Sequence, residues 1–97
     1  MDATSARTLA AAKLRELTDP AYPLALDDER GPAERSWCWV FPFNTAAWFA
    51  SRDPLDAVLS GPVVVPKDGR DVFVVGTARP VDTLLAEYAA AHGYPER

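Results

Sequence analysis

The stretch Gly61–Pro80 reads GPVVVPKDGRDVFVVGTARP and predicts the centre of the fold. It holds two apolar runs, Val63–Val65 and Val72–Val75, and β-branched and aromatic residues pack well on a pleated sheet. The connector contains Asp68-Gly69. Because glycine enters the left-handed backbone region without steric cost, we predict a tight hairpin turn with positive φ at Gly69. Each run is apolar at consecutive positions, so both strands are expected to be covered on both faces.

A hairpin alone is only marginally stable in water, so other elements must cover it. Thr4 or Ser5 is expected to cap an N-terminal helix, which ends at Thr18-Asp19-Pro20 because the residue before proline resists the helical region. A second helix is predicted from Val81 to His92, with Gly93 as its C-terminal cap. Both helices carry an apolar stripe at helical spacing: Ala6, Leu9, Ala10, Leu14 and Leu17 in the first, and Val81, Leu84, Leu85 and Tyr88 in the second.

Two strands and a short helix are predicted between these helices. The strands are Tyr22–Leu26 and Ser36–Phe43. At Pro42 the second strand is expected either to lie near an edge or to end, because proline cannot donate to a ladder. Asp53-Pro54 predicts a short helix with Asp as cap and Pro at its first position. Its residues Leu55, Val58 and Leu59 are expected to face inward. The element order predicts one α+β domain over residues 1–97, with a small antiparallel β-sheet packed by N- and C-terminal helices.

The second strand, SWCWVFPF, begins a segment that holds every tryptophan of the chain. By period two, Trp37, Trp39, Phe41 and Phe43 share one face, and Cys38, Val40 and Pro42 share the other. Such a cluster is either the core of a small sheet or, in part, a partner-binding patch, because Trp and Tyr dominate interface hot spots. The sequence favours the core for Trp37 and Trp39, and both interpretations stay open for Trp48.

Composition excludes several classes of protein. A net charge of −4 over 97 residues argues against nucleic-acid binding, which depends on neutralising phosphates. The acidic surface either meets a basic protein or keeps a small domain soluble. One cysteine rules out an internal disulfide and is typical of a cytoplasmic protein, and no apolar run is long enough to span a membrane.

Candidate catalytic groups are few. One Cys and one His are too few to hold zinc, and the glycines form no phosphate- or dinucleotide-binding pattern, so no metal or other cofactor is expected. One Cys and one His are enough for a nucleophilic Cys38–His92 pair, so the sequence leaves this possibility open. However, Cys38 alternates with tryptophans in an apolar strand, where a thiol is an inert small hydrophobe, and His92 suits the C-terminus of a helix. The protein is not expected to be an enzyme.

Several motifs follow one another along the chain: Trp37-Cys38-Trp39-Val40-Phe41, Gly61-Pro62-Val63-Val64-Val65, Lys67-Asp68-Gly69, Gly76-Thr77-Ala78-Arg79-Pro80, and Leu85 with Tyr88. This ordered set resembles the YrhB-type, or immunity protein 35, domain. The resemblance implies a bacterial immunity protein that binds a cognate polymorphic toxin, encoded by a neighbouring gene, and occludes its active site. Papain-like peptidase toxins accompany some members. A chaperone-like or general protein-binding module is the alternative, and a Cys38 enzyme is a third.

The binding surface is predicted on the charged connector Asp27–Arg35, at Asp27, Asp28, Glu29 and Glu34, together with Trp48. The connector concentrates negative charge with few local arginines, and a solvated hairpin loop is the alternative interpretation. Trp48 offers the aromatic anchor that interfaces commonly use.

Overall fold

The architecture was obtained as a computed structural model, which describes residues 1–95. Its strands are β1 (Leu24–Leu26), β2 (Ala33–Glu34), β3 (Cys38–Phe41), β4 (Phe43–Thr45), β5 (Val63–Pro66) and β6 (Phe73–Val74). Its helices are α1 (Ala3–Leu17), α2 (Ala46–Ser51), the 3-10 helix η1 (Pro54–Asp56) and α3 (Val81–His92). One sheet has the strand order β2-β3-β5-β6, a second consists of β1 and β4, and all pairs are antiparallel.

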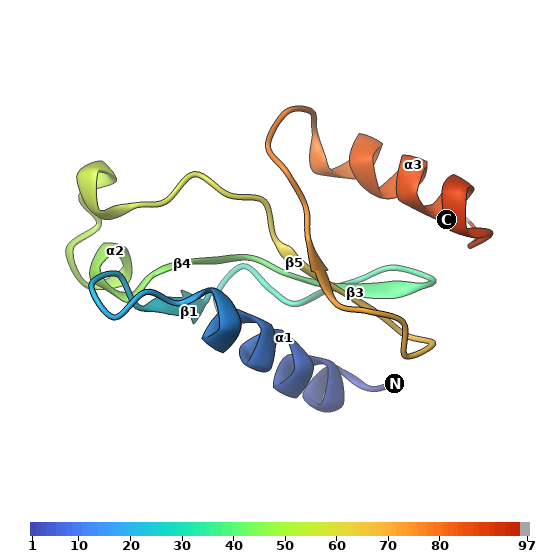
Figure 1. Cartoon of the computed structure of the whole chain (residues 1–97), viewed down its shortest axis with the longest axis horizontal. Helices are drawn as coiled ribbons and strands as arrows, with labels where there is room; N and C mark the ends of the chain where they lie inside the picture. The colour runs from blue at the N-terminus through green and yellow to red at the C-terminus, as the bar shows by residue number, and fades with distance from the viewer. Residues whose placement is uncertain (96–97) are drawn as a thin grey trace.

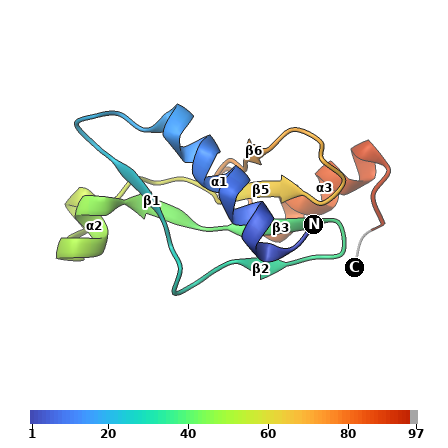
Figure 2. The same cartoon turned by 90° about the horizontal axis from the view of Figure 1, so that it is seen from below.

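The two long helices cover opposite faces of the four-stranded sheet (Figure 1). Buried residues of α1 pack with Phe41, Val63 and Val65, whereas those of α3 pack with Val40 and Val64. The predicted α+β class, with an antiparallel sheet between N- and C-terminal helices, is confirmed. Figures 1 and 2 both place α2 at the end of the molecule that lies away from the two chain termini.

The hairpin predicted from Gly61–Pro80 lies at the centre of this arrangement. Val63, Val64 and Val65 are all fully buried and point alternately to the two cores, which confirms a strand covered on both faces. The turn is also confirmed, because Gly69 has φ +88°. Strand β6 is shorter than the predicted Val72–Val75 and pairs with β5 through Phe73 and Val74 only.

We expect Gly69→Val to lower the free energy of unfolding by about 1–2 kcal/mol. An added Cβ at Gly69 meets nothing within 4 Å, so the loss comes from the backbone conformation and not from a clash. Gly69→Asn is the matched control and should lose less, because asparagine enters the left-handed region more readily. Urea denaturation measures both variants, and an unchanged midpoint for Gly69→Val would contradict the required positive φ.

Helix α1 departs from its prediction at two points. Its N-terminal cap is Asp2, whose carboxylate accepts the N–H of Ser5 at 2.8 Å, and not Thr4 or Ser5. Its buried stripe is narrower than predicted, since Leu9 and Leu17 are 40% and 47% exposed. Leu17 is the last helical residue, and the buried side of α1 is formed by Ala6, Ala10 and Leu14. The two alanines bring the helix close to the sheet.

The predicted first strand, Tyr22–Leu26, is shorter in the structure, because Tyr22 forms an isolated bridge with Asp19 and the ladder begins at Leu24. The predicted second strand is divided at Pro42 into β3 and β4, as a residue without an N–H requires.

The predicted alternation of side chains between the two faces of the sheet is confirmed for the four residues of β3 and wrong for Trp37, which precedes it. Trp39 and Phe41 pack on the α1 side, whereas Cys38 and Val40 pack on the α3 side. Trp37 was expected beside Trp39 but lies in the α3 core, because it precedes β3 and the pleat does not govern its direction. Its ring stacks on Tyr94 with centroids 4.6 Å apart.

The apolar stripe of α3 is confirmed, and so is the left-handed cap at Gly93, with φ +76°. An unpredicted contact ties this helix end to the hairpin turn, because the hydroxyl of Tyr94 donates to the Asp68 carboxylate at 2.9 Å. Burial and this bond raise the pKa of Tyr94. Burial alone would raise the pKa of Asp68 as well, but the hydrogen bonds from Arg70 and Tyr94 hold it below its usual value.

The segment between β4 and β5 was only partly predicted. Asp53 caps a short helix as expected, with its carboxylate accepting the N–H of Leu55 at 2.9 Å. Helix α2 was missed, although Thr45 caps it by accepting the N–H of Trp48. The inward orientation of Leu55, Val58 and Leu59 was wrong, because these side chains are 91%, 38% and 91% exposed. The single turn of η1 lies next to α2, at the end of the molecule away from α3 (Figure 1), and none of its residues is buried.

Candidate partner-binding surface

The charged connector is an ordered turn followed by strand β2, and Asp27 organises it. This side chain is 9% exposed, and its Oδ1 accepts the backbone N–H groups of Glu29 and Arg30, both at 3.1 Å. The carbonyl of Asp27 accepts the N–H of Gly31, and its Oδ2 lies 3.7 Å from Nε of Arg30. The carboxylate of Asp27 is therefore occupied in shaping the turn.

The other connector acids lie on the surface, and each has a cationic partner from a distant segment. Asp28 accepts two hydrogen bonds from Arg7 of α1, which hold its pKa below the usual value. Glu29 lies 3.7 Å from Arg52. Glu34 is 2.6 Å from Nζ of Lys67. The local excess of negative charge inferred from the sequence is thus compensated in the folded protein.

Trp48 lies on α2, neither buried in the core nor fully exposed. The guanidinium of Arg52 lies over its ring at 4.5 Å from the centroid, and Phe49 meets it edge to face at 5.2 Å. Arg52 itself has φ +58° and terminates α2 in the left-handed region. Because Arg52 also faces Glu29, the chain Trp48–Arg52–Glu29 joins the aromatic and the acidic parts of the predicted surface.

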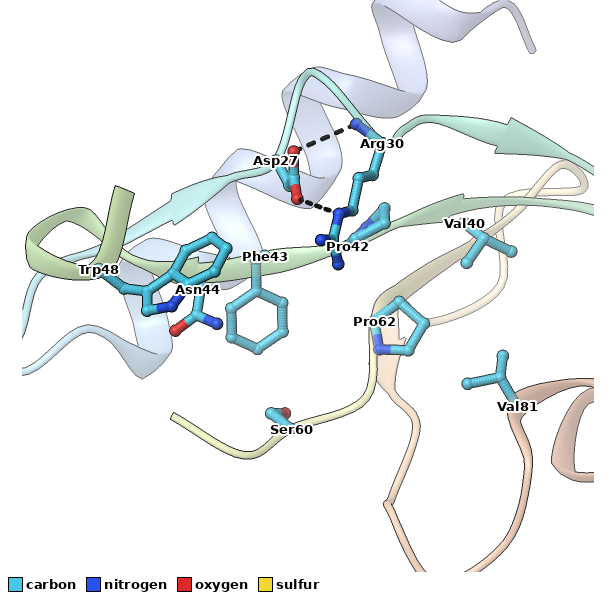
Figure 3. A pocket seen from close by; sticks show the side chains of 10 residues that line it. All are labelled: Asp27, Arg30, Val40, Pro42, Phe43, Asn44, Trp48, Ser60, Pro62 and Val81. Atoms are coloured by element: carbon cyan, nitrogen blue, oxygen red, sulfur yellow. Dashed lines mark hydrogen bonds and ion pairs between the residues drawn. The ribbon is translucent and has the colours of Figure 1, made fainter. Parts of the chain in front are cut away.

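A hollow of about 440 Å³ opens beside Trp48. Figure 3 shows Trp48 on one side of it, the Asp27–Arg30 pair on another, and Ser60 and Pro62 opposite them. Its walls combine apolar side chains with one carboxylate, one guanidinium and the amide of Asn44. The carbonyl oxygen of that amide accepts the N–H groups of Thr45 and Val58, so it holds β4 against the segment after η1.

Glu34 lies apart from the remaining predicted residues. It pairs with Trp39 in the β2–β3 ladder. Thr45, the cap of α2, lies six positions after Trp39, which corresponds to roughly 20 Å of extended chain. The structure therefore brings Asp27, Glu29 and Trp48 to one region and leaves Glu34 at the other end of the sheet.

Sequence reasoning missed Arg7 and Arg52, which complete this region. No local signal identifies Arg7, because it is recognised only by its contact with Asp28, 21 residues along the chain. Arg52 lies four residues after Trp48, and this helical spacing was a local signal for its contact with the ring. The two members of the candidate Cys38–His92 pair lie in different surroundings: Cys38 is fully buried in the sheet, while the exposed ring of His92 stacks on Tyr88.

Within residues 1–95, no three His, Cys, Asp or Glu side chains are grouped so that they could hold a metal ion. No helix in the same range combines the length and apolar character needed to cross a membrane.

The chain matches the family model of immunity protein 35 over residues 4–91. It belongs to this family. The match runs from α1 to the last turn of α3 and so includes the whole sheet. Neither the curated proteins nor the solved structures provide a match. The immunity protein 35 match agrees with the family expected from the ordered motifs between Trp37 and Tyr88.

Proposed function

We propose that this member of the immunity protein 35 family neutralises a cognate polymorphic toxin by binding it directly in one-to-one stoichiometry. The family match over residues 4–91 carries the proposal, because it covers nearly the whole chain. The bound immunity protein covers the active site or the substrate groove of the toxin. A papain-like peptidase is one class of toxin that fits this proposal. The mechanism needs no catalytic group of the immunity protein. It acts in the cytoplasm of the producing cell.

The proposed surface is centred on Trp48, with Arg52, Asp28 and Glu29 around it. An aromatic ring that is neither core nor fully solvated can bury its remaining area against a partner, and tryptophan and arginine are enriched among interface hot spots. The compensated acids contribute mainly to orientation, because exposed ion pairs add little net energy. Asp27 supports this surface by holding the turn that carries Asp28 and Glu29.

The test uses the product of the adjacent gene, made catalytically inactive, and measures its binding to the immunity protein by surface plasmon resonance. Trp48→Ala is expected to raise the off-rate about 30-fold, which corresponds to roughly 2 kcal/mol of lost hot-spot energy. Its melting temperature should change little, because none of the residues of α2 is buried.

Trp39→Ala is the matched control, since Trp39 is also partly buried but lies near the opposite end of the sheet. When binding is measured at a temperature at which the Trp39→Ala variant is folded, the off-rate should equal that of the wild type. If wild-type protein does not bind the neighbouring toxin, and instead suppresses the aggregation of many unrelated clients, the chaperone-like alternative replaces the proposed function.

A further inference from the structure

The largest exposed apolar side chains are concentrated in two segments at one end of the molecule. Leu17 and Tyr22, 47% and 66% exposed, lie at the end of α1 and in the loop that follows it. Leu55, Val58 and Leu59 lie in and after η1. Figures 1 and 2 both place these segments at the same end of the molecule as α2, away from the N-terminus. We call the five residues the apolar tip.

A groove of about 290 Å³ joins the two segments of the apolar tip. Leu24 and Phe43 of the two-stranded sheet line it together with Leu17, Tyr22 and Val58, and Asp19 lies at its rim. The exposed apolar residues are therefore not scattered singly over the surface. Leu17, Tyr22 and Val58 share a patch with a concave centre, and Leu55 and Leu59 flank Val58 along the chain. Such patches on soluble proteins mark interaction sites.

In the described part of the chain, acidic side chains without a cationic partner lie at the same place. Residues 17–23 and 53–59 contain three aspartates and no lysine or arginine. Asp19 and Asp53 accept backbone N–H groups, and Asp56 accepts the hydroxyl of Ser51. Among residues 1–95, no ion pair joins any of these three carboxylates to a cationic side chain. The connector acids, in contrast, are all paired.

The apolar groove and the unpaired carboxylates together indicate which kind of partner binds at the tip. In a two-fold contact between copies of the chain, the patch would meet itself, and three carboxylates would face three others without a cation to separate them. A partner with an apolar projection surrounded by lysines or arginines fits both the groove and its charge. We infer that the apolar tip, with Asp19, Asp53 and Asp56 at its edge, is a docking surface for a basic face of the cognate toxin. This inference rests on the proposed function and extends it to a second surface next to Trp48.

The apolar part is tested with the double variant Leu55→Ser/Leu59→Ser and the inactive product of the adjacent gene. Both side chains are 91% exposed, so the melting temperature should stay within a few degrees of wild type. The dissociation constant is expected to rise at least 10-fold, mainly through the off-rate. Leu9→Ser is the control. Leu9 is an exposed leucine of α1 placed eight residues, or roughly 12 Å, from Leu17, and its replacement should leave the affinity unchanged.

The charged part is tested with Asp19→Asn/Asp53→Asn/Asp56→Asn, in which each amide keeps an oxygen that can accept the backbone N–H groups or the hydroxyl of Ser51. The on-rate at low salt is expected to fall about 10-fold and its dependence on ionic strength to flatten. Glu87 lies on α3 and is paired with Arg79. Glu87→Gln removes this one charge and should change neither the on-rate nor its dependence on ionic strength.

Three outcomes are distinguishable. If wild type and both tip variants bind the toxin with the same affinity, the docking inference is wrong while the proposed function stands. If light scattering shows that the wild-type chain alone dimerises and that Leu55→Ser/Leu59→Ser is a monomer, the tip is a self-association surface and the inference is overturned. Loss of toxin binding in the tip variants, with a monomeric wild type, supports it.

Discussion

Leu85→Ala is expected to lower the free energy of unfolding by about 3–4 kcal/mol, because it truncates a side chain that is almost completely buried. Leu85 is 1% exposed and lies in the core between α3 and the sheet, where it packs with Trp37, Val40 and Val64. Truncation removes the buried methyl groups and leaves a cavity that the strands of a paired sheet cannot close. Chemical denaturation followed by tryptophan fluorescence measures the loss.

Leu59→Ala makes the same chemical change at a side chain that is 91% exposed, and it should shift the free energy of unfolding by less than about 0.5 kcal/mol. The comparison also tests a correction made by the structure, because Leu59 was expected to face inward. A loss in Leu59→Ala close to that in Leu85→Ala would show that the segment after η1 is part of the core.

Gly61→Ala is expected to destabilise the protein by about 3 kcal/mol through a steric conflict. A Cβ on Gly61 would lie 2.2 Å from the carbonyl oxygen of Val75 and 2.9 Å from its carbonyl carbon. Both are backbone atoms, and the adjoining bond from the Val75 N–H to the carbonyl of Pro62, at 3.0 Å, prevents the two chains from separating freely. The added methyl therefore forces β5 and the chain after β6 apart.

Gly76→Ala is the matched control for this effect. A Cβ on Gly76 meets nothing within 4 Å, so its thermal midpoint should stay near that of wild type. Equal midpoints for Gly61→Ala and wild type would contradict the close approach of Gly61 to Val75. An equal loss in both glycine variants would instead point to a general effect of replacing glycine in this region.

The predicted binding residues fall into two groups: one could be recognised from the local sequence, and the others have partners that are distant in the sequence. Trp48 could be identified as a candidate from the sequence, and its half-buried position leaves it able to contact a partner. The acids of the connector were also candidates from the sequence, but the cationic side chains that pair with them were not predictable. Arg7 pairs with Asp28 across 21 positions, and Lys67 pairs with Glu34 across 33. The site therefore depends on contacts that no local pattern encodes.

The amino-acid sequence by itself determined the features that depend on neighbouring residues. A run of three valines specified a doubly covered strand, Asp68-Gly69 specified the turn, and the spacing of Leu84, Leu85 and Tyr88 specified the buried side of α3. Each follows from backbone sterics or from a fixed periodicity over a few positions.

Only the tertiary structure decided which apolar side chains find a partner and which charges are compensated. Leu55 and Leu85 both stand in apolar patterns of helical character, yet one is 91% and the other 1% exposed. Periodicity defines the direction of a side chain relative to its own element, whereas burial requires a second element within reach. The sheet provides that element beneath α3 and ends before η1, and this is why the apolar tip remains open to solvent.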